Sequence, residues 1–328
     1  MKYRDFGKTG IKVSEIGFGT WAIGGNCHGM SYGPTDDKVS TDAVMRALEL
    51  GLNFFDTADV YGWGHAEELL GKCFRGRRDR IILAAKVGAD FYQGTGFQTF
   101  TPEYIRFALE KSLARLQTDY LDVYQLHNPP LKLLGNEATY ATLRDLKREG
   151  KIRAWGVSVF TAVEGITAIN VGRPDCLQIA YNIFSFRPAE QLFPLAYEKG
   201  CAIIAREPLA NGFLTGKYKA GKPFRFAAGD MRKSWPDDYI KARIEAAAQL
   251  GFLERVGQSM PQAALRYSLD EASISTVIVG MKTPEQAEEN IEAVQSSLRE
   301  PELSKIRELQ ARGFKSDREN GKEIQKKL

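Results

Sequence analysis

Eight short apolar segments rich in β-forming residues recur along the chain, and a longer stretch with helical spacing separates each from the next. Parallel strands need such crossover helices, and eight β-then-α units are the number that closes a barrel. The predicted strands cover residues 16–20, 52–58, 80–88, 121–127, 154–158, 176–182, 201–207 and 275–280. The predicted helices cover residues 38–50, 66–75, 102–116, 136–149, 161–170, 188–199, 261–271 and 284–293. This pattern predicts an α/β fold, a (β/α)8 TIM barrel, with an open doubly wound sheet as the alternative.

The length of the chain fits one such barrel with additions. A (β/α)8 barrel takes ~250 residues, and the chain has 328. We therefore expect residues 1–328 to form a single domain. The surplus is assigned to an N-terminal β-hairpin, to long loops at residues 88–100 and 208–240, and to a polar C-terminal tail from about residue 310. Loops that follow strands lie at the C-terminal face of a barrel, so we expect both long loops there.

The composition of the chain bears on whether it binds nucleic acid, a membrane or a metal ion. The chain carries 45 Lys+Arg against 41 Asp+Glu, a balance of +4, so its charge favours neither nucleic acid nor a membrane surface as a partner. No apolar run approaches the ~20 residues of a membrane-spanning helix, and the charged N-terminus is unlike a signal peptide, so we expect a cytoplasmic protein. The four cysteines are scattered, with no CxxC pair. We expect neither a disulfide framework nor a metal site.

Four polar residues lie at or just beyond the predicted strand ends, where barrel enzymes place their chemistry. Asp56, Lys86 and His127 end the second, third and fourth apolar segments, and Tyr61 follows in the loop after the second. Singly, each has an ordinary explanation as a loop cap, a surface lysine, a buried histidine or a packed aromatic. Together they are harder to dismiss, because a lysine inside IILAAKVG needs a charge partner and Asp56 on the adjacent strand can supply it.

At this point the sequence resembles the aldo-keto reductase superfamily over nearly its whole length. The resemblance is carried, in the family's order and spacing, by GFGTW, NFFDTADVYGWGHAEELLG, ILAAKVG, LDVYQLHNP, GKIRAWGVS, LQIAYN, PLANGFLTGKY and IVGMKTPEQAEENIEA. Within the superfamily, the sequence is most similar in its motifs to the bacterial and potassium-channel β-subunit-like branches. The resemblance implies a nicotinamide-dependent oxidoreductase acting on a small aldehyde, ketone or sugar. It also implies a catalytic tetrad, namely Asp56, Tyr61, Lys86 and His127.

The chemistry of carbonyl reduction explains these residue types. Hydride addition leaves alkoxide charge on oxygen, which needs a proton donor and a local positive field. Tyr61 can donate, but a phenol with a pKa of ~10 needs a nearby cation to do so at neutral pH. Lys86 is that cation, Asp56 holds it charged, and His127 can orient the carbonyl oxygen. The hydride belongs to the cofactor.

The resemblance also implies cofactor-binding residues. Those expected beside the nicotinamide and its ribose are Thr20, Trp21, Asp56, Ser158 and Gln178. Those expected along the pyrophosphate, where Gly212 permits close approach of the backbone, are Arg206, Pro208, Leu209, Gly212 and Lys217. Those expected in the last barrel unit, around the adenosine, are Gly280, Lys282, Thr283, Gln286, Glu289 and Asn290.

The last unit also bears on the choice between cofactors. A 2′-phosphate favours cations and a helix N-terminus. Lys282 and the helix starting near Pro284 supply these, with Lys217 and, less directly, Arg232 as additions. Many relatives have further cations at the places of Gly280 and Gln286. We therefore predict NADP(H), by a smaller margin than in such relatives, and leave NAD(H) open.

Three departures from the family pattern concern the pocket. Val159 follows Ser158 where an Asn is usual, and Asn128 follows His127 where many members have Trp. Arg206 replaces an aromatic residue, and it can stack on the nicotinamide, reach a phosphate or meet an acidic substrate. The residues expected to line the substrate pocket are Trp21, Trp63, Phe91, Tyr92 and Asn128.

Two other functions remain as alternatives. A cofactor-binding, redox-sensing regulatory subunit would have little turnover, but the tetrad is complete. A lyase would use Lys86 as a Schiff-base nucleophile, which requires a neutral amine, whereas Asp56 favours the charged form. The substrate, the favoured direction and the oligomeric state are left open by the sequence.

Overall fold

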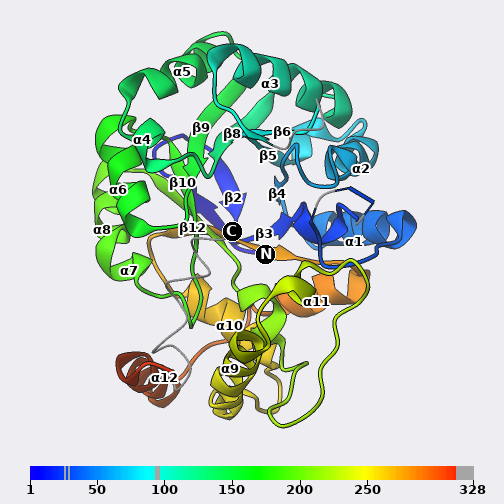
Figure 1. The fold of residues 1–328 in the computed structure, drawn as a ribbon, viewed down its shortest axis with the longest axis vertical. Coiled ribbons are helices and arrows are strands. Elements are labelled where there is room, and N and C mark those ends of the chain that lie inside the picture. Colours follow the sequence, from blue (N-terminus) through cyan, green and yellow to red (C-terminus); the bar gives the residue numbers. More distant parts are fainter. Residues whose placement is uncertain (26, 29, 93–96, 315–328) are drawn as a thin grey trace.

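The computed structural model describes residues 1–25, 27–28, 30–92 and 97–314, and in this part of the chain eight parallel strands close into a barrel (Figure 1). The strands, in order around the barrel, are β3 (Ile16–Gly19), β4 (Phe54–Asp56), β5 (Ile82–Val87), β8 (Leu121–His127), β9 (Ile152–Ser158), β10 (Cys176–Ala180), β11 (Ala202–Arg206) and β12 (Ile274–Gly280). Every neighbouring pair is parallel, and β12 pairs with β3 to complete the ring. The predicted (β/α)8 barrel is confirmed.

Helices surround the barrel in the order that the crossover pattern predicts (Figure 1). They are α1 (Asp37–Glu49), α2 (His65–Phe74), α3 (Pro102–Leu116), α4 (Leu131–Leu134), α5 (Ala141–Arg148), α6 (Ala162–Val171), α7 (Pro188–Gln191), α8 (Phe193–Lys199), α9 (Asp237–Ala248), α10 (Met260–Leu269), α11 (Pro284–Glu292) and α12 (Glu300–Arg312). Apolar side chains between the strands and these helices form the main core. No helix in the described ranges combines the length and hydropathy that a membrane crossing requires.

Two helix starts have a threonine cap followed by proline. The Thr101 hydroxyl accepts a hydrogen bond from the Tyr104 N–H at the start of α3, and the Thr283 hydroxyl accepts one from the Gln286 N–H at the start of α11, both at 3.3 Å. In both helices proline occupies the first turn, where the missing N–H costs no intrahelical bond. The threonine cap and the proline together mark where α3 and α11 begin.

The N-terminal hairpin closes the bottom of the barrel. Strands β1 (Tyr3–Asp5) and β2 (Lys12–Ser14) are antiparallel. Phe6, Ile11 and Val13 pack against inward-facing residues of the barrel strands in a separate apolar cluster. The close fit requires Gly7, because a Cβ there would lie 2.5 Å from the carbonyl oxygen of Gly200. The hairpin therefore leaves only the opposite, C-terminal face available for a site.

The predicted helices differ from the structure at several places. The helix expected at 188–199 is two short helices, α7 and α8, because Pro194 cannot donate to the preceding turn. Three further helices, α4, α9 and α12, were not predicted. Helix α9 begins inside the long loop expected at 208–240, and α12 occupies a region that includes the start of the polar tail expected from about residue 310. Residues 315–328 lie outside the described part of the chain.

The signal for α9 was present in the sequence. Ile240 and Ile244 have helical spacing, and both are buried in a second apolar cluster together with Leu250 and Ile306. The other long loop, at 88–100, contains a short antiparallel pair, β6 (Ala89–Asp90) and β7 (Phe97–Gln98). Both loop regions lie beyond the C-terminal ends of barrel strands, as predicted.

Candidate active site

The fold brings the four tetrad residues together at the C-terminal face of the barrel. Asp56 ends β4, Lys86 lies one residue before the end of β5, and His127 ends β8. Parallel pairing sets β4 beside β5 and β5 beside β8, and Tyr61 comes from the loop after β4. A pocket of about 880 Å³ opens here, lined by Asp56, Tyr61 and His127 among others. Residues far apart in sequence thus share one cavity.

Lys86 is the centre of the contacts within the tetrad. Its side chain is fully buried, and its Nζ lies 2.5 Å from Oδ2 of Asp56. The same nitrogen donates to the backbone oxygen of Thr57 at 2.9 Å and to the hydroxyl of Tyr61 at 3.2 Å. Burial alone would lower the pKa of Lys86, but the charge of Asp56 and the influence of Tyr61, together with the hydrogen bonds to both, outweigh it, and the pKa is raised. Lys86 is therefore a buried, charged ammonium with all three N–H groups in use.

Asp56 is held by amides as well as by the lysine. Its second oxygen, Oδ1, accepts from Nε2 of Gln178 at 2.8 Å and from Nε2 of Gln125 at 3.3 Å. Both glutamines are buried within apolar strands, where an amide needs a partner. Gln178 therefore contacts the tetrad directly. Gln125 was not singled out from the sequence, although a glutamine inside the apolar segment LDVYQLH was a usable signal.

Tyr61 and His127 present neutral groups to the pocket. Burial raises the pKa of Tyr61, and the Lys86 charge opposes that rise. Burial lowers the pKa of His127 well below its ordinary value, and the charges of Lys86 and Arg206 add to this effect. The two rings meet edge to face with centroids 5.9 Å apart. At neutral pH the site therefore holds a protonated phenol beside an uncharged imidazole.

Most of the expected cofactor residues line this pocket. They are Trp21, Asp56, Ser158, Gln178, Arg206, Pro208, Leu209, Gly212, Lys217, Gly280, Lys282, Gln286, Glu289 and Asn290. Thr20 and Thr283 are not among its lining residues. Thr20 is buried, and its hydroxyl and the indole N–H of Trp21 have no partner among the described residues. Buried donors without a partner are rare, so these two are candidates for contact with a bound molecule.

The far end of the pocket gathers cations. Lys217, Arg232 and Lys282 line it, and burial together with the other two charges lowers the pKa of Lys282, which Asp230 opposes. The ammonium of Lys282 donates to the backbone oxygens of Tyr32, at 2.9 Å, and Pro34, at 3.4 Å. The positive end of the pocket is therefore already joined to the loop after β3.

The other residues expected around the adenosine lie just before or within α11. The side-chain oxygen of Gln286 accepts from the Lys282 N–H at 2.8 Å, and Thr283 caps the helix. Glu289 accepts from the Ser259 hydroxyl at 2.9 Å, and Asn290 is buried. The start of α10 thus meets the C-terminal half of α11 at this edge of the pocket.

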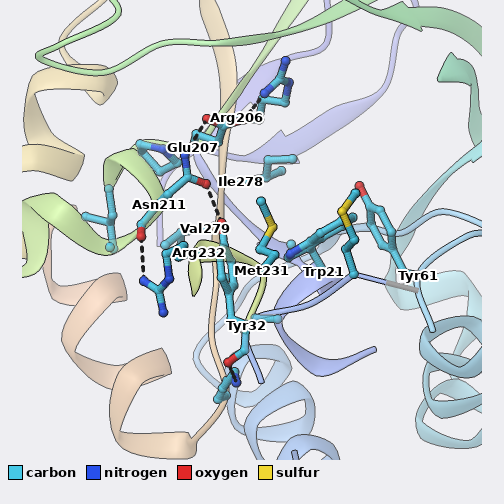
Figure 2. Close-up of a pocket in the computed structure, with 18 of the residues that line it drawn as sticks. Trp21, Tyr32, Tyr61, Arg206, Glu207, Asn211, Met231, Arg232, Ile278 and Val279 are labelled. Carbon is cyan, nitrogen blue, oxygen red and sulfur yellow. Dashed lines mark hydrogen bonds and ion pairs between the residues drawn. The ribbon is translucent and has the colours of Figure 1, made fainter. Parts of the chain in front are cut away.

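Arg206, whose role the sequence left open, is paired within its own segment. Its guanidinium donates to Oε1 of Glu207 and to the backbone oxygen of Val159, the latter at 3.2 Å. It also lies 5.6 Å from the ring of Phe160. Figure 2 shows Arg206 and Glu207 at one side of the pocket, facing Asn211. The charge of Arg206 is thus largely balanced by Glu207.

Of the five expected substrate-pocket residues, Trp21 and Asn128 line the pocket. The Asn128 side chain is fixed by the Ser158 hydroxyl, which donates to its Oδ1 at 2.9 Å. Trp63, Phe91 and Tyr92 do not line it and instead stack on one another, with centroids 5.9 Å and 4.3 Å apart. Their loops fold together beside the pocket, so for these three the expected lining role is not met.

Four functional candidates at the pocket were missed by sequence reasoning: Tyr32, Glu207, Asn211 and Asp230. Tyr32, Asn211 and Asp230 lie in loops with no strand-end position to mark them, whereas Glu207 ends the predicted strand 201–207 and could have been found by that position. Their contacts arise only when the loop after β3 meets the loop after β11. Within the described ranges, no three His, Cys, Asp or Glu side chains are grouped so as to hold a metal ion.

The model of the Aldo/keto reductase family matches residues 15–311. A relative in Bacillus subtilis, Aldo-keto reductase YhdN, is 36% identical over 295 residues, covering 88% of this chain and 87% of the relative. The NADH-specific methylglyoxal reductase of Escherichia coli is 29% identical over 327 residues, covering 94% and 98% of the two chains.

Two solved structures are similar across nearly the whole chain. The holo form of the aldo-keto reductase AKR11C1 from Bacillus halodurans has a TM-score of 0.77 and 31% identity, covering 94% of this chain and 96% of that chain. The glycerol dehydrogenase AKR11B4 from Gluconobacter oxydans has a TM-score of 0.80 and 27% identity, covering 94% and 95%. With its closed eight-stranded barrel and its matching sequence, the chain belongs to the aldo/keto reductase family of oxidoreductases.

Proposed function

We propose that the protein is an NADP(H)-dependent reductase of small aldehydes, ketones or sugars, which oxidises the matching alcohols in the reverse direction. The observation that carries the proposal is the 3.2 Å hydrogen bond between the Lys86 ammonium and the Tyr61 hydroxyl at the pocket. An acid next to a buried, permanently charged cation is what protonation of a developing alkoxide requires.

Each tetrad residue has a distinct task in this proposal. His127 is neutral, so one of its ring nitrogens can donate a hydrogen bond to the carbonyl oxygen and orient it. Tyr61 passes its phenolic proton to that oxygen, and the charge of Lys86 stabilises the phenolate left behind. Asp56 keeps Lys86 charged and in place. When bound, a nicotinamide cofactor supplies the hydride that adds to the carbonyl carbon.

The pocket fits a dinucleotide in three respects. Trp21, which lines the pocket and whose indole N–H has no partner among the described residues, lies at the nicotinamide end implied by the family resemblance. Gly212 has a φ of +90° beside the pocket, which leaves its backbone open to close approach. Lys217, Arg232 and Lys282 gather at the other end, where phosphates would be neutralised. Members of this family use nicotinamide cofactors.

The preference for NADP(H) rests on Lys282 and the start of α11. The Escherichia coli relative is NADH-specific, so family membership does not decide between the two cofactors. A 2′-phosphate paired with one well-placed cation gains ~1.5–3 kcal/mol over a neutral hydroxyl. Lys282 now donates to two backbone oxygens, and it can exchange these neutral acceptors for an anionic one at little cost.

The substrate class follows from the tetrad end of the pocket. Trp21, His127 and Asn128 line it there, which provides one apolar wall and two polar side chains for a small oxygenated carbonyl. The two relatives named for a methylglyoxal reductase and a glycerol dehydrogenase act on small oxygenated molecules of this kind.

The test is turnover of NADPH and NADH with a panel of simple aldehydes, methylglyoxal and glyceraldehyde, and of NADP⁺ and NAD⁺ with glycerol and sugars. We expect NADPH oxidation with at least one carbonyl. Tight NADPH binding without turnover of any substrate would instead support the redox-sensing regulatory subunit. Cleavage or formation of carbon–carbon bonds without cofactor would support the lyase that uses Lys86, which the raised pKa of Lys86 disfavours.

A further inference from the structure

Tyr32, in the loop after β3, reaches across the pocket to the loop after β11. Its hydroxyl donates to Oδ1 of Asn211 at 2.5 Å. Figure 2 shows the Tyr32 side chain extending from below toward Asn211, with Trp21 to its right and Tyr61 beyond Trp21. Burial raises the pKa of Tyr32, so the hydroxyl remains a donor at neutral pH. The two residues are 179 positions apart, and neither strand ends nor capping patterns predicted the contact.

The segment that Tyr32 contacts has an unfavourable backbone. Glu207, Ala210 and Asn211 have φ values of 57°, 46° and 56°, in the left-handed region that non-glycine residues rarely adopt. Such conformations persist only where surrounding contacts impose them. All three residues fall within 207–212, which also lines the pocket.

The contacts that impose this conformation form one continuous chain. Tyr32 donates to Asn211, the Asn211 amide donates to Oε2 of Glu207 at 3.1 Å, and Oε1 of Glu207 accepts from Arg206. Asn182 donates to the Glu207 backbone oxygen at 2.8 Å. Both ends of this series of hydrogen bonds are anchored. Arg206 belongs to β11, and Lys282 donates a hydrogen bond to the Tyr32 backbone oxygen.

A second set of contacts joins the same two loops independently. Arg232 donates to the Asn211 backbone oxygen at 2.8 Å, and its guanidinium lies 4.9 Å from the centre of the Tyr32 ring. Asp230 pairs with Arg232 at 2.6 Å, and the Met231 N–H donates to the Ser31 oxygen at 2.9 Å. Tyr32 thus lies between Asn211 on one side and Arg232 on the other.

We propose that Tyr32 is a positioning residue, which acts through Asn211 to hold residues 207–212 in their strained conformation over the cofactor-binding part of the pocket. This inference rests on the proposed function only for its consequence, which is slower release of a bound dinucleotide. Without the Tyr32 hydroxyl, the segment has one contact fewer to offset its backbone strain. It should therefore open more often, and the cofactor should dissociate faster.

The test uses Tyr32→Phe, which keeps the ring against Trp21 and Arg232 and removes only the hydroxyl. Two quantities are measured: amide hydrogen exchange of residues 207–216 without cofactor, and the NADPH dissociation rate by displacement. We expect both to increase roughly 3- to 10-fold, the effect of losing one hydrogen bond between neutral groups.

Tyr140→Phe is the matched control. Tyr140 is another buried tyrosine with one hydrogen bond, to the Leu134 oxygen at 2.7 Å, and it does not line the pocket. This variant should leave both measured rates at wild-type values. A second variant, Asn211→Gly, keeps the left-handed backbone accessible and removes the amide. Adding Tyr32→Phe to Asn211→Gly should accelerate exchange and dissociation no further, if Tyr32 acts through Asn211.

The outcomes separate the two proposals. Unchanged exchange in 207–216 with Tyr32→Phe would overturn the role of Tyr32, as would an equal increase with Tyr140→Phe or additive effects in the double variant. If the wild-type protein binds no nicotinamide dinucleotide, the proposed function fails, and the exchange measurement without cofactor still decides whether Tyr32 positions this segment.

Discussion

The Lys86 ammonium lies 3.2 Å from the Tyr61 hydroxyl, and both groups are buried. The lysine comes from a barrel strand and the tyrosine from the loop after the neighbouring strand. A cation at this distance favours the phenolate over the phenol, while burial favours the phenol. The pair can therefore hold a proton at rest and release it when negative charge develops on a nearby oxygen.

Tyr61→Phe tests the proton donor. The variant keeps the ring and removes only the acidic hydroxyl, so we expect kcat for aldehyde reduction to fall by at least ~10²-fold. Cofactor affinity should stay nearly unchanged, and NADPH titration by fluorescence measures it separately. Wild-type turnover in this variant would mean that another group supplies the proton.

Borohydride trapping tests the chemistry of Lys86. A lysine held charged by Asp56 at 2.5 Å is a poor nucleophile. Treatment with borohydride and an aldehyde or ketone substrate should leave no adduct on Lys86, as read by peptide mass spectrometry. A substrate-sized adduct at that residue would place the protein in the Schiff-base class.

Lys282→Ala tests the cofactor preference. Removal of this cation should weaken NADPH binding by about 10- to 100-fold, the effect of losing one charge-assisted hydrogen bond. NADH lacks the 2′-phosphate, so its Kd should barely change. Lys111→Ala, an exposed lysine of α3 outside the pocket, is the control and should alter neither Kd. Equal losses for both cofactors, or a wild-type preference for NADH, would contradict the proposal.

Asp59→Asn tests a buried carboxyl beside the tetrad. Burial raises the pKa of Asp59 well above its usual range, the Glu67 carboxylate adds to this, and Arg115 opposes it. From about pH 4 up to that raised pKa, the unfolded chain releases this proton more readily than the folded one. The contribution of Asp59 to stability is therefore fully present below pH ~4 and is lost as the pH rises.

The measurement is Tm across pH 5 to 8 for wild type and variant. The difference in Tm, variant minus wild type, should increase with pH, because the variant has no group to titrate at this position. Asp79→Asn, at an exposed aspartate, serves as the control and should show no such trend. A difference in Tm that stays flat across this range would show that Asp59 ionises as readily in the folded protein as in the unfolded one.

The sequence by itself determined the barrel and the partners within the tetrad. Strand segments such as IILAAKV and LDVYQLH are apolar enough to be buried on both faces, and crossover helices follow them, so parallel closure follows from local pattern. Burying an unpaired ammonium costs much free energy, so a lysine within such a strand needs a charged partner. An acid on the neighbouring strand can be that partner. For that reason the contact between Lys86 and Asp56 was predictable from the sequence alone.

The tertiary structure decided the loop contacts. Trp63, Phe91 and Tyr92 stack beside the pocket instead of lining it, and Arg206 pairs with Glu207 instead of pointing free into the cavity. Barrel strands are visible in the sequence as short apolar segments separated by crossover helices. Loop residues have no such pattern, and contacts such as Tyr32 to Asn211 depend on how two loops, distant in sequence, meet above the barrel.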